Sequence, residues 1–120
     1  MKEEVQKWMN KAESDLSASR KSIESKEFEW AGFQIQQAVE KSLKSVLIFK
    51  EDKLFKTHDL IVLGKEAGLP MDLIEYCEDL SKLYLHSRYP DVVDIENLSK
   101  KIKVYLGWAE EILKWSKKQI

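Results

Sequence analysis

The chain has few of the residues that break helices or cross-link loops. Its 120 residues include 4 Gly, 2 Pro and 1 Cys. Folds made of short strands and tight turns need more glycine and proline, so this composition excludes most all-β folds. The single cysteine, Cys77, excludes a disulfide-bonded scaffold. No apolar run approaches the roughly 20 residues that span a bilayer, and the N-terminus has no apolar signal core. We therefore expect a soluble cytoplasmic protein that does not contact membranes.

An excess of positive charge, typical of general nucleic-acid binding, is also absent. The chain has 20 Lys and Arg against 21 Asp and Glu. These charges are unevenly placed, since residues 100–118 hold six lysines and residues 66–96 hold eight acids. Such runs are typical of solvated helix faces. The hydrophobic content of 43% is enough for the core of one domain. We predict a single domain over residues 1–120.

Apolar residues recur at steps of three and four along most of the chain, which is the period of an α-helix. Strand-like alternation does not persist anywhere in the sequence. The spacing predicts helices over residues 3–24, 27–50, 58–67, 71–88 and 94–118. We predict an all-α fold, an up-and-down helical bundle of four long helices plus one short helix.

The ends of the short helix are marked by polar and helix-breaking residues. Thr57 is a favourable N-cap, and Asp59 would then lie in the first turn, where its negative charge suits the helix dipole. Gly68 ends this helix. Pro90 disfavours helical geometry at the residue before it, so we expect the following helix to end near Arg88.

The last helix carries a second apolar stripe beside its core face, made by Val104, Trp108 and Trp115. This stripe needs a partner, either a neighbouring helix of the same chain, for example through Trp8, or another subunit. The second helix also carries an extra stripe, which consists of Gln37, Lys41, Lys44 and Ile48. The two stripes cannot both face one small core, so we predict a homodimer that uses at least one of them.

The residue types that hold metals or phosphates are too few or wrongly spaced for the common sites. A zinc site needs about four ligands, and Cys77, His58 and His86 are irregularly spaced. Gly64 and Lys65 lack the neighbouring glycine and hydroxyl residue of a phosphate-binding loop. We expect neither a metal nor a cofactor.

Two segments still concentrate chemically active side chains. For the first, Thr57-His58-Asp59-Leu60, simple helix capping is the alternative to a functional role. The second, His86-Ser87-Arg88-Tyr89-Pro90-Asp91, places an imidazole, a guanidinium, a phenol and a carboxylate at a helix end. Arginine suits bidentate contact with phosphate or carboxylate, whereas a local ion pair between Arg88 and Asp91 would only stabilise the turn. On a continuous helix His86 and Arg88 would point about 160° apart, so one subunit would not direct both at the same ligand.

Several motifs stand in a recognisable order and spacing. They begin with Trp8 and Ala12-Glu-Ser-Asp15-Leu16, and continue with Phe33-Gln-Ile-Gln-Gln-Ala-Val-Glu40-Lys41-Ser-Leu-Lys44. Thr57-His58-Asp59-Leu60 and Ser87-Arg88-Tyr89-Pro90-Asp91 follow. Together they resemble the HEPN domain (higher eukaryotes and prokaryotes nucleotide-binding) over nearly the whole chain. The Gln-Gln-Ala-x-Glu-Lys and Arg-Tyr-Pro-Asp segments are the most specific part of this resemblance.

The resemblance implies a helical bundle that usually dimerises. Stand-alone prokaryotic members are often encoded beside a minimal nucleotidyltransferase, and several such pairs act as toxin and antitoxin, with the HEPN protein as a metal-independent ribonuclease. The nuclease members carry an Arg followed after four to six residues by a His. That motif is absent after both Arg20 and Arg88. The resemblance therefore favours a nucleotide- or RNA-binding partner of a nucleotidyltransferase. The alternatives are a divergent ribonuclease, with His86 and Arg88 acting across a dimer interface, and a helical adaptor without a ligand.

The predicted site follows from the two chemically active segments and from the resemblance to the HEPN domain. Arg88 would contact a phosphate or an acidic partner group, Tyr89 would stack or hydrogen-bond, and Asp91 would orient the guanidinium. Lys41 and Lys44 would add positive potential from the second helix. The full set of predicted ligand- or partner-binding residues is Arg88, Tyr89, Asp91, Lys41, Lys44 and His58. If the protein is an enzyme, the catalytic candidates are His86 and Arg88.

Overall fold

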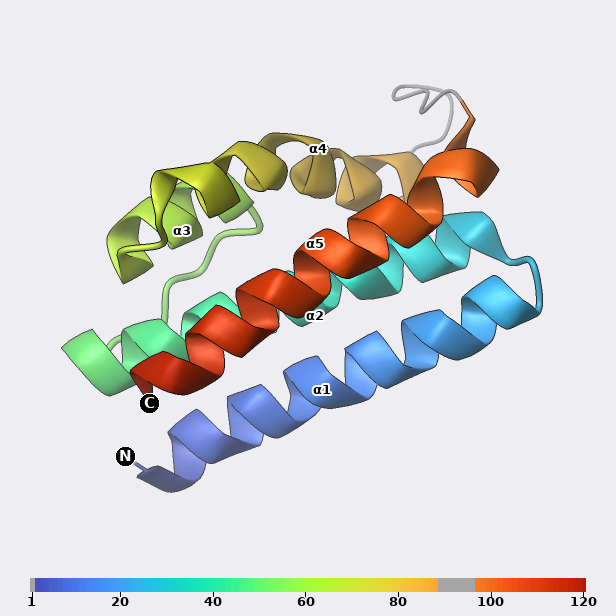
Figure 1. Cartoon of the computed structure of the whole chain (residues 1–120). Helices are drawn as coiled ribbons and strands as arrows, with labels where there is room; N and C mark the ends of the chain where they lie inside the picture. The colour runs from blue at the N-terminus through green and yellow to red at the C-terminus, as the bar shows by residue number, and fades with distance from the viewer. Residues whose placement is uncertain (1, 89–96) are drawn as a thin grey trace.

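The computed structural model describes residues 2–88 and 97–120, with the backbone alone for residues 2 and 85–88. Every regular element in these ranges is a helix. The elements are α1 (Lys2–Glu24), α2 (Phe28–Glu51), α3 (Leu60–Ala67), α4 (Met71–Arg88) and α5 (Leu98–Gln119). The four long helices alternate in direction, and the two chain ends lie at the same end of the bundle (Figure 1). The predicted all-α up-and-down bundle is confirmed.

Helix α2 is the centre of the bundle and contacts each of the other four helices. Helices α1 and α5 lie beside it, and α3 and α4 cover its remaining side (Figure 1). Most positions between Ala31 and Ile48 are buried, because the other four helices all pack against α2. Polar side chains are nevertheless buried within it, namely Gln36, Glu40, Ser42, Lys44 and Ser45. Buried polar groups need hydrogen-bond partners, and those of α2 define the site described below.

The start of α3 differs from the prediction, because the N-cap is Asp59 and not Thr57. The Asp59 carboxylate accepts hydrogen bonds from the backbone N–H groups of Ile61, at 2.9 Å, and Val62, at 3.3 Å. Thr57 instead accepts a hydrogen bond from the N–H of Asp59, at 3.1 Å, through its hydroxyl oxygen. Both side chains can cap a helix, and the placement of the first turn against α4 decides between them.

The opposite end of α3 agrees with the sequence. Gly68 has a φ of 84°, and its N–H donates to the carbonyl oxygens of Gly64 and Lys65. Glycine adopts this left-handed conformation most readily because it has no β-carbon, and the helix ends there as predicted.

The extra stripe on α5 is largely covered by the same chain. Trp108 stacks on Tyr76 of α4, with ring centroids 4.4 Å apart and planes 3° apart. The ammonium of Lys50 lies 5.5 Å from the ring centroid of Trp115. The intrachain partner of Trp108 is thus Tyr76 and not Trp8. Val104 is 50% exposed, which leaves it as the accessible member of the stripe. None of the described helices is long and apolar enough to cross a membrane.

Candidate functional site

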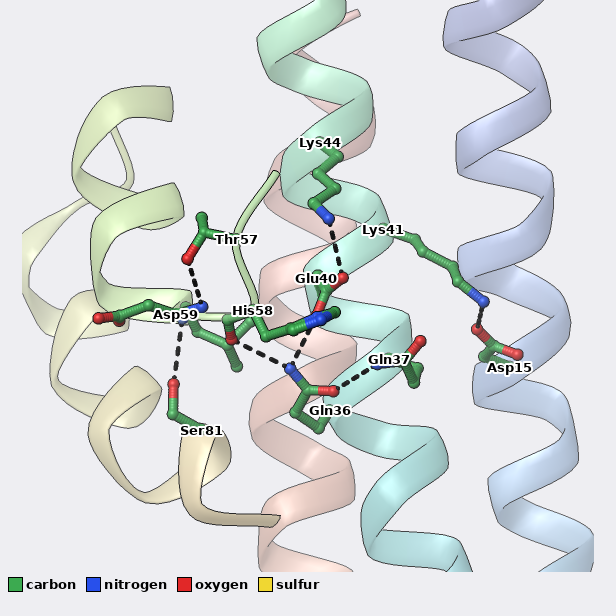
Figure 2. Close-up of polar contacts among 11 residues, drawn as sticks. Asp15, Gln36, Gln37, Glu40, Lys41, Lys44, Thr57, His58, Asp59 and Ser81 are labelled. Atoms are coloured by element: carbon green, nitrogen blue, oxygen red, sulfur yellow. Dashed lines mark hydrogen bonds and ion pairs between the residues drawn. The ribbon is translucent and has the colours of Figure 1, made fainter. Parts of the chain in front are cut away.

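Glu40, a buried carboxylate in the middle of α2, is the centre of a polar network (Figure 2). Its side chain is 5% exposed. Its Oε2 accepts a hydrogen bond from the Lys44 ammonium at 2.9 Å. Its Oε1 accepts one from the Gln36 amide at 3.0 Å and lies 3.0 Å from Nδ1 of His58. Both carboxylate oxygens are therefore engaged, by groups one turn away on either side and by the segment that follows α2.

The surroundings of Glu40 favour its ionised form. Burial raises the pKa of this carboxyl, but the hydrogen bonds from Lys44, Gln36 and His58 and the charge of Lys44 lower it by more. The net result is a pKa below its ordinary value of 4.5. The site thus contains a buried carboxylate that is negatively charged at neutral pH and is paired with a buried ammonium.

His58 is held in place through its backbone as well as its ring. The Gln36 amide donates a second hydrogen bond, of 3.3 Å, to the backbone carbonyl of His58. On the other side, the N–H of Leu60 donates to the hydroxyl of Ser81 on α4, at 3.1 Å. Together with the cap at Asp59, these contacts attach the segment to both α2 and α4 (Figure 2). A short loop is thereby given a defined position for its imidazole.

The His58 ring is the exposed end of this network, because 57% of its side chain is accessible. It stacks on Tyr84 of α4, with centroids 4.5 Å apart and planes 17° apart. Tyr84 continues to Phe33, at 5.7 Å, and Phe33 stacks on Trp30, at 5.4 Å. We call His58, Tyr84, Phe33 and Trp30 the aromatic row. It ends at Trp30, which is 53% exposed.

Lys41 and Lys44 lie three residues apart on α2, within one turn, but have different partners. Lys41 donates to the Asp15 carboxylate of α1 at 2.6 Å, and both side chains are about one quarter exposed, at 23% and 26%. Lys44 is 8% exposed and is paired with Glu40. Lys41 therefore contributes its charge at the surface, whereas Lys44 stabilises the buried carboxylate.

The other predicted residues fall in three places. His86 and Arg88 lie in the last turn of α4, after Tyr84, and only their backbone is described. Tyr89 and Asp91 lie outside the described residues. Val104, Trp108 and Trp115 belong to α5 and are not part of the polar network. The structure thus brings together His58 and Lys44 through Glu40.

Sequence reasoning did not identify Glu40, Gln36 or Tyr84 as site residues. A usable signal was present for the first two, because Gln36, Glu40 and Lys44 recur at steps of four within a helix that also carries many apolar residues. Polar residues at an inward-facing period indicate a buried network. For Tyr84 no local signal exists, since its role depends on the approach of His58 from another segment.

The described residues offer donors, acceptors and aromatic faces. Within residues 2–88 and 97–120, no group of three or more His, Cys, Asp or Glu side chains could hold a metal ion. Cys77 is buried, and this burial together with the charge of Asp59 raises the pKa of its thiol to about 12. A thiol with that pKa is not a nucleophile at neutral pH. The chemistry available is stacking, hydrogen bonding and proton transfer at His58.

The comparisons with known proteins agree with this all-α bundle. The family model of the HEPN domain matches residues 5–120. The crystal structure of TT1696 from Thermus thermophilus has a TM-score of 0.85 and 24% identity, over 97% of this chain and 98% of that chain. ST0689, an archaeal HEPN homologue, has a TM-score of 0.81 and 30% identity, over 96% of each chain. No curated protein matches. The chain belongs to the HEPN domain family, which confirms the resemblance found in the sequence.

Proposed function

We propose that this HEPN protein binds a nucleotide or RNA on the aromatic row, as the partner of a minimal nucleotidyltransferase in a two-component, toxin–antitoxin-like module. The observation that carries the proposal is the stacking of the exposed His58 ring on Tyr84. The buried Glu40 carboxylate contacts Nδ1 of the same ring and fixes its position. Nucleobases bind to such rows by stacking, and imidazole and amide groups add hydrogen bonds to base edges. Arg88 in the last turn of α4 remains our candidate for the phosphate.

Substitution of one tyrosine tests this assignment. Stacking on an aromatic side chain contributes about 1–3 kcal/mol per base, so Tyr84→Leu is expected to weaken binding by about 5- to 150-fold. Tyr76→Leu is the matched control, because Tyr76 is also an α4 tyrosine stacked on an aromatic ring, that of Trp108. Binding is measured by fluorescence anisotropy with labelled single-stranded RNA, and by competition with unlabelled mononucleotides. Equal losses in the two variants would reject the aromatic row as the site.

Cleavage of RNA without a metal is a second candidate function, supported by the geometry of His58. Its Nδ1 contacts a buried carboxylate at 3.0 Å, and its Nε2 has no hydrogen bond to any residue in the described ranges. This is the arrangement of an oriented general base. In the presence of EDTA, RNA cleavage by the wild type and its loss in His58→Gln would favour this function. Binding without cleavage would favour the first.

Partnership with a nucleotidyltransferase is tested by co-expression. If the neighbouring reading frame encodes a minimal nucleotidyltransferase, we expect the two proteins to co-purify as a complex. Substitution of Arg88 by Lys should weaken the complex or the nucleotide contact, because lysine cannot reproduce a bidentate guanidinium contact. The absence of such a neighbouring gene would contradict the two-component module, and the proposal of nucleotide or RNA binding would then stand alone.

A further inference from the structure

A second cluster lies between α1 and α2, beside the polar network of Glu40. A pocket of about 190 Å³ is lined by Lys7, Trp8 and Lys11 from α1 and by Lys41 from α2. Pockets for drug-sized ligands usually exceed about 300 Å³, so this one matches a single base or phosphate group. Its lining combines three ammonium groups with one aromatic ring.

The charge of this pocket is incompletely balanced. Lys41 is paired with Asp15, but no carboxylate in residues 2–88 or 97–120 lies within ion-pair distance of Lys7 or Lys11. These two lysines stand one turn apart on α1, where like charges repel each other. An anion bound between them would relieve that repulsion and would gain charge-assisted hydrogen bonds.

Trp8 connects the pocket to the site already described. The Lys44 ammonium lies 5.8 Å from the Trp8 ring centroid and also donates to Glu40, which contacts His58. Gln37 and Lys41 lie on α2 between the His58 segment and α1 (Figure 2). The two carboxylates of this region are both ion-paired, Asp15 with Lys41 and Glu40 with Lys44. A polyanion that crosses α2 here would therefore meet compensated acids, an amide and ammonium groups.

We propose that Lys7, Trp8 and Lys11 form a second nucleotide contact, and that the ligand is a single-stranded oligonucleotide whose chain runs across α2 from this pocket to the aromatic row. This inference rests on the proposed function and deepens it, because a mononucleotide would occupy one contact only. Stacking on aromatic rings combined with a cationic path along the backbone is how single strands are held without sequence preference. RNA and DNA both present bases and phosphates to these contacts, so both are used as probes.

The experiment compares two lysine pairs of the same spacing. Lys7→Gln/Lys11→Gln removes the pocket charge, and Lys114→Gln/Lys118→Gln removes the same charge from exposed positions on α5. Affinity is measured for a mononucleotide and for single-stranded RNA and DNA oligomers of increasing length, at several salt concentrations.

For the wild type, affinity should rise with length beyond one nucleotide. The α1 variant should bind oligomers about tenfold more weakly or worse, equivalent to at least one charge-assisted hydrogen bond. Its slope of log affinity against log salt should fall by about 1.4, while the part of mononucleotide binding that depends on Tyr84 stays unchanged.

The α5 variant should retain oligomer affinity. Trp8→Leu should reproduce the loss seen for the lysine pair, with the melting temperature measured in parallel. Equal weakening by both lysine pairs, or an affinity that does not depend on oligomer length, would overturn this inference. If in that case mononucleotide binding still depended on Tyr84, the proposed function would stand alone. If the wild type bound neither mononucleotide nor oligomer, both proposals would fall. A preference of the wild type for RNA over DNA of the same sequence would assign the ligand to RNA.

Discussion

Glu40 illustrates how a single buried charge can be retained in the core of a small bundle. Its carboxylate is desolvated by the surrounding helices, and the cost is offset by Lys44, Gln36 and His58. Hydrophobic residues of similar volume often stabilise a fold as much as a buried ion pair does. The presence of the pair therefore points to its role in positioning His58, which is the exposed member of the network.

Substitution of Glu40 by Gln should destabilise the protein and change its response to acid. Removal of one partner leaves the Lys44 ammonium buried and uncompensated, so we expect a loss of about 3 kcal/mol at pH 7, the lower end for a broken buried pair. Because folding lowers the pKa of Glu40 below 4.5, the stability it contributes is present above that pH and is lost as the pH falls through the lowered value. The variant should lack this acid-dependent part in urea titrations.

Glu110→Gln is the control for that experiment. Glu110 forms an ion pair with Arg20 at 2.8 Å, but its side chain is 46% exposed. An exposed pair contributes about 0–1 kcal/mol, so this variant should unfold at nearly the wild-type urea concentration. If the two variants lost the same stability, Glu40 would behave as a surface residue and the described network would be contradicted.

The short helix α3 depends on close packing against α4 at Gly64. A β-carbon at this position would lie 2.8 Å from Cδ1 of Ile74 and 3.2 Å from Cδ2 of Leu69. On α5, a β-carbon at Gly107 would have no neighbour within 4 Å among the described residues. Two glycines in helices thus have opposite surroundings.

Gly64→Ala and Gly107→Ala should therefore change the free energy of unfolding in opposite directions. At Gly107 the gain in helix propensity acts alone, and we expect a stabilisation of about 0.5–1 kcal/mol. At Gly64 the same gain is opposed by displacement of Ile74 and Leu69, and we expect a loss of about 1 kcal/mol. Urea unfolding at equal protein concentration measures both values. A Gly64→Ala variant as stable as Gly107→Ala would contradict the close approach of α3 and α4.

The helices were predictable from the sequence because their signals are local. The expected ranges 3–24, 27–50 and 71–88 agree with α1, α2 and α4 to within one residue at each end. The last helix begins at Leu98, and residues 94–96 of its predicted range lie outside the described part of the chain. Apolar periodicity repeats every turn and needs no knowledge of the other elements.

The site was predictable only in part, because it depends on contacts between distant segments. His58 was selected from its short motif, and the structure places it in the network. Its partners Glu40 and Tyr84 are 18 and 26 positions away in sequence and come from two different helices. No local spacing links such residues. The N-cap of α3 was misassigned for a similar reason, since Ser81 of α4 binds the amide of Leu60 and helps to set where the helix begins.

The bundle leaves Val104 on α5 as an exposed apolar residue beside a face that is otherwise covered. The homodimer remains a prediction, and Val104→Glu tests it more directly than a substitution of Trp108 does. Trp108→Glu would also disturb the stack on Tyr76 and hence the fold. If α5 forms the interface, Val104→Glu should raise the dimer dissociation constant by at least about tenfold in sedimentation equilibrium.

Ser99→Glu is the control for dimerisation, because it adds the same charge at an exposed position of α5 on a different face. It should leave the dissociation constant unchanged. A single species of 14.1 kDa at all concentrations from micromolar to near-millimolar would contradict the dimer itself. A dimer that tolerates Val104→Glu would direct attention to Gln37 and Lys41, the partly exposed members of the α2 stripe, because Lys44 and Ile48 are buried within the chain.

The central position of α2 also determines how the protein opens. Helix α2 contacts all the other helices, so it cannot unfold locally without disrupting the whole bundle. The amide hydrogens of α2 should therefore exchange with solvent only through global unfolding. Helix α3 has 8 residues and, among the described helices, contacts only α2 and α4, so it can detach at a lower free energy. Glu40 belongs to the most persistent helix, whereas His58 precedes the least persistent one. Each local opening of α3 should therefore separate the imidazole from its carboxylate while the rest of the bundle stays intact.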